Sequence, residues 1–185
     1  AVAVDMLRVE LDMPVLGVIG PGARAGIAAS VNGRIGVIAT RGTVASGAYG
    51  KELAGLSGKA ELFSQAAPLL VPLAEEGWLD GAVPTEVVAH YLEPLASAGV
   101  DTLILGCTHY PWVAEAISRR MPAGVALLDT GEPVARQLER LLSAGRLLGG
   151  GSGQLKVATS GAPHAVSATV DRLWGRHLPV EHWEP

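Results

Sequence analysis

Cysteine is almost absent from this sequence, since Cys107 is the only one in 185 residues. A single thiol excludes an internal disulfide framework. Aromatic residues make up 4% of the chain, so we expect a core built from Ala, Val, Leu and Ile. No apolar run reaches the roughly 18 residues that suggest a transmembrane helix, and no basic-then-apolar start resembles a signal peptide. These absences predict a soluble, cytoplasmic protein without a membrane partner.

Positive charge is also scarce, because 14 Lys and Arg residues stand against 18 Asp and Glu residues. This balance argues against non-specific nucleic-acid binding, which needs a basic surface. The sequence has no H-x-x-x-H or C-x-x-C spacing, so no metal site is expected. It has no phosphate-binding G-x-x-x-x-G-K-[ST] motif, and the glycines at 149–153 precede a predicted strand instead of following one. No cofactor is therefore expected.

Strand-like and helix-like segments alternate along most of the chain. The pattern predicts strands at 15–19, 34–40, 59–63, 102–105, 125–129, 155–159 and 179–183. It predicts helices at 1–11, 23–30, 43–53, 85–98 (with Thr85 as N-cap), 111–121, 132–143 and 163–174, a mixed segment at 66–78 and a linker at 149–153. This order indicates an α/β fold with a parallel sheet covered by helices on both faces.

Ligands bind such sheets outside the carboxyl ends of the strands. Three loops that follow predicted strands and lead into helices meet this condition: Gly20–Ala23, Thr40–Thr43 and Gly106–His109. All three contain glycine or small hydroxyl residues, and a helix N-terminus offers free backbone N–H groups to a carboxylate or phosphate.

The stretch Asp101–Pro111 (D-T-L-I-L-G-C-T-H-Y-P) holds the lone cysteine between a strand and a helix. A helix N-terminus lowers a thiol pKa, and the thiolate of Cys107 can then act as a nucleophile or a proton-transfer base. His109 is a candidate general acid or thiol-tuning group, and Thr108 can offer its hydroxyl and amide to a substrate carboxylate. The alternatives are an inert, buried cysteine and a structural histidine.

Two further groups of residues are candidates. Thr40 ends a predicted strand, and the pair Gly42-Thr43 that follows it either forms only a turn and an N-cap or lets Thr43 and nearby amides hold a substrate carboxylate. Glu75 and Glu76 are adjacent acids that either lie on a solvated helix face or place one carboxylate against His109. Asp129 is interpreted as structural, as a cap for the helix that follows it.

Four segments together resemble glutamate racemase, the cofactor-independent enzyme that supplies D-glutamate for bacterial peptidoglycan. They are D-M-P-V-L-G-V-I-G-P-G-A-R-A (12–25), G-R-I-G-V-I-A-T-R-G-T-V-A-S-G-A-Y (33–49), P-L-L-V-P-L-A-E-E-G (68–77) and D-T-L-I-L-G-C-T-H-Y-P (101–111). The related aspartate racemases tend to carry an acid where this chain has His109. Gly20 departs from the family, which often has Glu there.

The resemblance implies an isomerase whose small-molecule substrate is glutamate. Two cysteines flank the substrate α-carbon, so that one thiolate removes the α-proton and the other thiol returns a proton to the opposite face. Cys107 aligns with the second of these cysteines, His109 with a thiol-assisting and substrate-binding position, and Glu75 with an acid that supports the histidine. Thr108 and Thr43 align with substrate-binding positions, and Thr40 is expected beside them.

The resemblance also implies two α/β lobes with the active-site cleft between them. Residues 1–12 are expected to be a remnant of the first lobe, 13–128 a complete second lobe, and 129–185 the part of the chain that returns to the first. The family's first cysteine lies in an A-C-N-T-A-S stretch that this sequence lacks, together with an aspartate-serine motif and a tyrosine-glycine pair. We therefore expect one of two catalytic thiols here, and no activity from this chain alone. The oligomeric state stays open, and a homodimer is among the states allowed.

Three other functions remain open at this point. The chain can belong to a racemase of aspartate or a hydantoin, although His109 argues against it. It can be a non-catalytic binding lobe in which Cys107 is structural. A Cys-His hydrolase is a further alternative, but the sequence shows no obvious third residue to orient His109 in such an enzyme and no oxyanion site.

Overall fold

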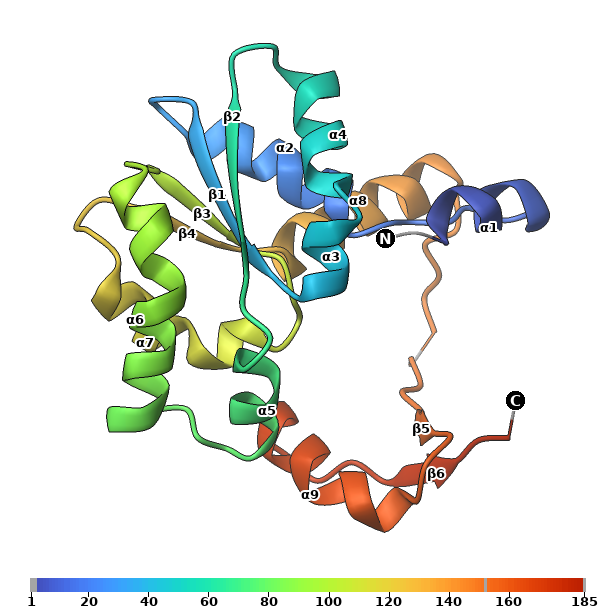
Figure 1. The fold of residues 1–185 in the computed structure, drawn as a ribbon. Coiled ribbons are helices and arrows are strands. Elements are labelled where there is room, and N and C mark those ends of the chain that lie inside the picture. Colours follow the sequence, from blue (N-terminus) through green and yellow to red (C-terminus); the bar gives the residue numbers. More distant parts are fainter. Residues whose placement is uncertain (1–2, 152, 185) are drawn as a thin grey trace.

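The computed structural model describes residues 3–151 and 153–184. Its main sheet has four parallel strands in the order β2-β1-β3-β4. These strands are β1 (Arg34–Ala39), β2 (Glu61–Ala66), β3 (Thr102–Leu105) and β4 (Ala126–Asp129). Helices cover both faces of this sheet (Figure 1), so the α/β class expected from the sequence is confirmed. No helix among the described residues is long and apolar enough to cross a membrane.

The helices follow the strands in βαβ order. They are α1 (Val4–Glu10), α2 (Ile19–Ala29), α3 (Arg41–Ala45), α4 (Ala48–Leu56), α5 (Leu70–Glu75), α6 (Ala82–Ser97), the 3₁₀ helix η1 (Tyr110–Val113), α7 (Ala114–Arg120), α8 (Gly131–Ala144) and α9 (Pro163–Trp174). In Figure 1, α2 and α4 lie on one side of the sheet, and α6 and α7 on the other. Each strand therefore has an apolar layer above and below it.

The hydrophobic core is split by the sheet into two clusters. Successive side chains of a strand point to opposite faces, and β3 follows this rule. Ile104 packs with α2 and α4 on one face, whereas Leu103 and Leu105 pack with α6, η1 and α7 on the other. All three are at most 1% exposed, which explains why β3 reads as a continuous apolar run.

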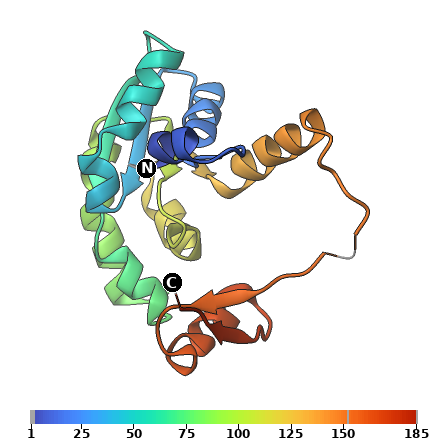
Figure 2. The same ribbon diagram turned by 90° about the vertical axis from the view of Figure 1, so that its right-hand side faces the viewer.

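A second, smaller sheet lies towards the C-terminus. Its strands β5 (Val157–Thr159) and β6 (Val180–His182) pair in parallel and are connected through α9. Figures 1 and 2 show this unit apart from the main sheet, at the end of the segment that follows α8. Helix α8 itself packs beside α2. The three-part division at residues 12 and 128 remains a prediction.

The predicted strand at 15–19 is wrong. This segment lies against α1, where the Val15 carbonyl accepts a hydrogen bond from Arg8 Nε at 3.3 Å and a Cβ added at Gly17 would come within 3.4 Å of the Val4 side chain. No strand of the sheet pairs with it among the described residues, and α2 begins already at Ile19. The apolar composition is strand-like, but among the described residues no strand lies beside this segment to form a hydrogen-bond ladder with it. The loop Gly20–Ala23 therefore lies inside a helix.

Most other predicted elements are confirmed with small shifts in their bounds. The helix expected at 43–53 is divided into α3 and α4, because Gly47 adopts a positive φ of 63° between them. The predicted N-cap Thr85 is wrong, since α6 begins at Ala82 and Gly81 precedes it. Pro84 is tolerated there because the first turn of a helix needs no donor from it.

Candidate active site

The carboxyl ends of β1 and β3 lie side by side and carry the loops Thr40–Thr43 and Gly106–His109. The Gly106 amide continues the ladder by donating to the Ile38 carbonyl at 2.8 Å. A Cβ on Gly106 would come within 3.0 Å of Ala39 Cβ and 3.2 Å of the Ile38 carbonyl oxygen. Only glycine allows the two strand ends to approach this closely. Two of the three loops selected from the sequence therefore meet at one edge of the sheet.

Cys107, His109 and Glu75 form a chain of contacts at this edge. Cys107 Sγ lies 3.9 Å from His109 Nδ1, at the outer limit for a hydrogen bond that involves sulfur. On the other side of the imidazole, His109 Nε2 lies 3.3 Å from Glu75 Oε1. The acid comes from α5, the helix that follows β2, so residues far apart in sequence meet here. Glu75, and not Glu76, contacts the histidine.

This chain of contacts selects Glu75 as the acid beside His109, where the sequence pattern left Glu75 and Glu76 open. Glu75 can hold the His109 ring in one orientation through this contact. The Glu75 side chain is 53% exposed and that of His109 29% exposed, so solvent screens their attraction. The contact therefore orients the imidazole ring and contributes little to the stability of the fold.

The electrostatic environment of Cys107 differs from the sequence expectation. Burial raises the pKa of the thiol above its ordinary value, and the backbone N–H groups of His109 and Tyr110 lower it by less. The expected net lowering by a helix N-terminus is wrong, because desolvation disfavours the thiolate more than these amides favour it. Cys107 therefore rests as a protonated thiol and needs a partner when it gives up its proton.

The hydroxyl residues occupy two different settings. Thr40 caps α3, since its Oγ1 accepts from the Thr43 amide at 3.4 Å, and the two hydroxyls lie 3.1 Å apart. The N-cap of α3 is therefore Thr40, and not a residue of the Gly42-Thr43 pair. Thr108 is exposed beside Cys107. Both Thr43 and Thr108 are at least partly accessible at the edge where the strands end.

Tyr110, which was not among the candidates selected from the sequence, also belongs to the site. Its ring is fully buried, and its hydroxyl donates to the Ala67 carbonyl at 2.8 Å. Burial raises the pKa of this phenol far above its ordinary value. The bond crosses from the end of β3 to the end of β2, so it fixes the loop of Cys107 relative to the segment that leads to Glu75. No local sequence signal identifies a backbone carbonyl 43 residues away as its partner.

Asp129, at the end of β4, is structural as expected. Its Oδ1 accepts from the Gly131 amide at 2.9 Å, at the start of α8. In residues 3–151 and 153–184, no group of three or more His, Cys, Asp or Glu side chains is arranged to hold a metal ion.

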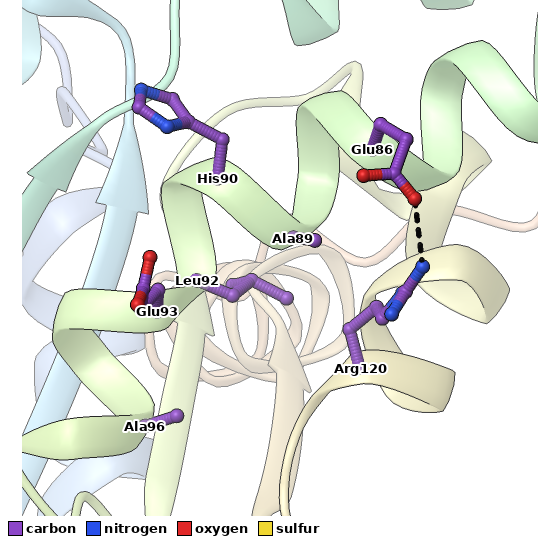
Figure 3. A pocket seen from close by; sticks show the side chains of 7 residues that line it. All are labelled: Glu86, Ala89, His90, Leu92, Glu93, Ala96 and Arg120. Carbon is purple, nitrogen blue, oxygen red and sulfur yellow. Dashed lines mark hydrogen bonds and ion pairs between the residues drawn. The ribbon is translucent and has the colours of Figure 1, made fainter.

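A separate hollow of about 390 Å³ lies between α6 and α7 (Figure 3). It is polar in part, and Glu86 and Arg120 form an ion pair of 3.3 Å beside it. None of the site residues predicted from the sequence lines this hollow. This hollow is therefore separate from the site around Cys107.

Comparison with known proteins indicates the family of this chain. A model described as Asp/Glu/Hydantoin racemase matches residues 1–138. The chain is 45% identical over 148 residues to a glutamate racemase of Geobacter metallireducens, covering 80% of this chain and 55% of that one. It is 39% identical over 186 residues to a glutamate racemase of Desulforudis audaxviator, covering 95% of this chain and 67% of that one. The chain thus spans between about half and two thirds of the length of these relatives.

Solved structures agree with the sequence comparison. The glutamate racemase isoform RacE1 of Bacillus anthracis superposes with a TM-score of 0.93 at 34% identity, over 97% of this chain and 68% of that one. The glutamate racemase of Francisella tularensis, solved in complex with D-glutamate, gives a TM-score of 0.88 at 26% identity, over 98% of this chain and 68% of that one. The chain therefore belongs to the Asp/Glu/Hydantoin racemase family.

Proposed function

We propose that the natural protein that contains this sequence interconverts L- and D-glutamate without a cofactor, and that Cys107 serves one face of the substrate α-carbon. One observation carries the proposal: in a chain of this family, a Cys107–His109–Glu75 contact chain lies where the parallel strands end. A substrate bound at this edge meets a thiol that is already paired with a proton acceptor.

The reaction needs two proton-transfer groups. In one direction, a thiolate on the far face takes the α-proton, and the Cys107 thiol donates its proton to the near face of the carbanion. The Cys107 thiolate that remains is stabilised by protonated His109, which Glu75 supports. In the reverse direction Cys107 starts as the thiolate, formed by proton transfer to His109, and removes the α-proton itself. No pyridoxal-like electron sink is involved, so both groups must be in position before the bond breaks.

A buried thiol with a raised pKa suits this role. A weakly acidic thiol is a strong base once it is deprotonated, and proton removal from a carbon acid needs a strong base. The histidine limits the cost of forming the thiolate. The same arrangement could serve a Cys-His hydrolase, but the family to which the chain belongs favours proton transfer over acyl transfer.

The second thiol must come from residues outside this sequence, because Cys107 is its only cysteine. We therefore propose that the 185 residues alone do not racemise glutamate. The cleft between two lobes, with residues 13–128 as one lobe, is part of the same proposal.

We propose that the substrate carboxylates are held by Thr43 and Thr108, with Thr40 supporting Thr43 through their 3.1 Å hydroxyl contact. The relatives named above are glutamate racemases, and one is solved with D-glutamate, which supports glutamate over aspartate. A role in supplying D-glutamate to peptidoglycan, a cytoplasmic location and a homodimer belong to this proposal as expectations from the family resemblance.

A substrate panel tests the proposal. We expect the natural protein in D₂O to exchange the α-hydrogen of L- and D-glutamate, followed by proton NMR, at least about tenfold faster than that of aspartate, because one methylene is worth about tenfold or more in a fitted site. Exchange that favours aspartate or a 5-substituted hydantoin would assign the chain to another branch of the family. No exchange with any of the three would support the non-catalytic binding lobe.

A further inference from the structure

Helix α5, which carries Glu75, ends in a turn that leaves one carbonyl without a backbone donor. The Trp78 amide donates to the Leu73 carbonyl at 2.8 Å, and the Gly77 amide donates to the Ala74 carbonyl at 3.1 Å. Gly77 has a positive φ of 76°, as this type of helix end requires. The carbonyl of Glu75 is the one that remains for a donor from elsewhere.

Arg172, on α9, provides that donor. Its Nη1 donates to the Glu75 carbonyl at 3.1 Å. The guanidinium also lies against Gly77, where an added Cβ would collide with Nη1 and would come within 3.2 Å of Cζ. The positive charge faces the C-terminal end of the helix, where carbonyl groups favour a cation. Two contacts thus fix the arginine over the last turn of α5.

This contact joins two parts of the chain that lie far apart in the sequence. Among the hydrogen bonds of the described residues, Arg172 to Glu75 is the one that links the β5–α9–β6 unit to residues 3–151. Figures 1 and 2 both show the region of α9 next to α5. The backbone of Glu75 is held by α9 while its side chain reaches His109 at 3.3 Å.

We propose that Arg172 is a positioning residue for the proton relay, because it fixes the last turn of α5 so that the Glu75 carboxylate stays against His109. This inference rests on the proposed function, since it assigns Arg172 a task in the same relay. A purely structural contact would change stability and leave the reactivity of Cys107 unaltered. If Arg172 positions Glu75, replacing Arg172 should change the reactivity of Cys107, although Arg172 belongs to the β5–α9–β6 unit.

The groups near Cys107 determine in which direction its reactivity should change when Arg172 is replaced. His109 comes from its own loop, Glu75 reaches it through His109 from α5, and Tyr110 and Tyr91 are the phenols packed nearby. A carboxylate held against His109 orients the ring to accept the proton of the Cys107 thiol. Loss of Arg172 lets the carboxylate move away, so less thiolate forms at a given pH.

The test is the pH profile of iodoacetamide alkylation at Cys107 in the full protein, quantified by peptide mass spectrometry. We expect E75Q to slow alkylation near neutral pH by about tenfold and R172A by about threefold, with both profiles moved to higher pH. R172K keeps a donor and should fall between R172A and the wild type. R176A removes an exposed charge from the same unit and should match the wild type.

The outcomes separate this inference from the proposed function. If E75Q shifts the profile and R172A does not, the relay stands and the role of Arg172 is refuted. If R176A shifts the profile as much as R172A, the effect is general electrostatics, which also refutes it. If E75Q leaves the profile unchanged, the relay itself fails and the inference fails with it. Circular dichroism melts of all four variants confirm that each is folded under the assay conditions.

Discussion

At Cys107, burial and hydrogen bonding act in opposite directions on the thiol pKa. Burial is the larger effect and raises it, while the amides of His109 and Tyr110 partly offset the change. The imidazole 3.9 Å away is the group that can take the proton. Under the proposed function, the reactivity of this cysteine depends on His109 and Glu75 more than on its place before a helix.

Replacement of Glu75 by Gln tests that dependence. E75Q keeps the size of the side chain but removes the charge that faces His109 Nε2 at 3.3 Å. We expect kcat for glutamate racemisation to fall by about tenfold or more, with a smaller change in KM, because the acid acts on proton transfer and does not touch the substrate. E76Q is the matched control and should remain near the wild-type rate. Equal losses in the two variants would show that α5 carries no specific acid.

Residue types and spacing were sufficient to predict much of this site. The adjacency of Cys107 and His109 after a strand indicated a thiol–imidazole pair, and the structure brings their side chains together. Glu75 and Glu76 could not be separated from sequence, because neighbouring residues on a helix differ by about 100° in direction and only the packing of α5 decides between them. The net direction of the thiol pKa shift depends on burial, which the sequence does not give.

Among the elements, the loop from β3 to η1 is held by its neighbours as well as by its own turn, in which the Tyr110 amide donates to the Cys107 carbonyl at 3.1 Å. The Tyr110 hydroxyl bonds the Ala67 carbonyl beyond the end of β2, and Gly106 packs against the end of β1. The loop is therefore attached to both strands on that side of β3.

Removal of the Tyr110 hydroxyl should loosen this attachment. We expect Y110F to lower the free energy of unfolding by about 0.5–1.5 kcal/mol, because the buried Ala67 carbonyl loses the tyrosine donor and keeps only the Leu70 amide at 3.2 Å. Urea unfolding followed by circular dichroism measures the change. Tyr49 is a suitable control, since it is also buried and no hydrogen bond of its hydroxyl occurs among the described residues. A smaller loss in Y110F than in Y49F would contradict the anchoring role.

At the opposite end of the sheet, Asp101 joins the start of β3 to the residues that follow α2 by hydrogen bonds. Its carboxylate accepts from Ser30 Oγ at 2.6 Å and from the amides of Val31 and Asn32 at 2.7 and 2.6 Å. Partial burial raises the pKa of this carboxyl, but these hydrogen bonds outweigh it, so the net pKa is lower than usual. The charged form is thus favoured by folding, and it joins the end of α2 to the start of β3.

Unfolding at a series of pH values tests the contribution of the Asp101 carboxylate to stability. D101A should lower the free energy of unfolding by about 1.5–3 kcal/mol near pH 7. Because the pKa is lower in the folded state, the contribution is complete above the unfolded value of about 3.9 and is lost as the pH falls through the folded value. The difference between wild type and D101A in urea unfolding should therefore shrink in acid. A difference that is constant from pH 7 to pH 3 would show that the charge is not involved.

The order of elements was largely predictable, and the exceptions have physical reasons. The strands 34–40 and 102–105 and the helix 163–174 match the structure within a residue, because each has a strong apolar pattern with clear ends. The segment 15–19 has the composition of a strand but no partner in the sheet, and pairing between distant segments cannot be read from local pattern.

For the whole molecule, the main sheet forms a complete three-layer unit, whereas β5 and β6 form a parallel pair of only two strands. Parallel sheets are usually covered on both faces and contain more strands. The chain spans 55% of the Geobacter metallireducens relative and 67% of the Desulforudis audaxviator relative. These facts agree with the proposal that racemisation requires groups beyond this sequence, the second thiol above all.

The most direct test of the central claim is the α-hydrogen exchange of L- and D-glutamate in D₂O, measured for the natural protein, its C107S variant and the 185-residue chain. The account predicts racemisation by the natural protein, a loss of at least about 100-fold in C107S because one of two proton-transfer groups is gone, and no racemisation by the 185 residues alone. Racemisation by C107S at a rate near the wild type would contradict it, because Cys107 would then serve neither face of the substrate carbon.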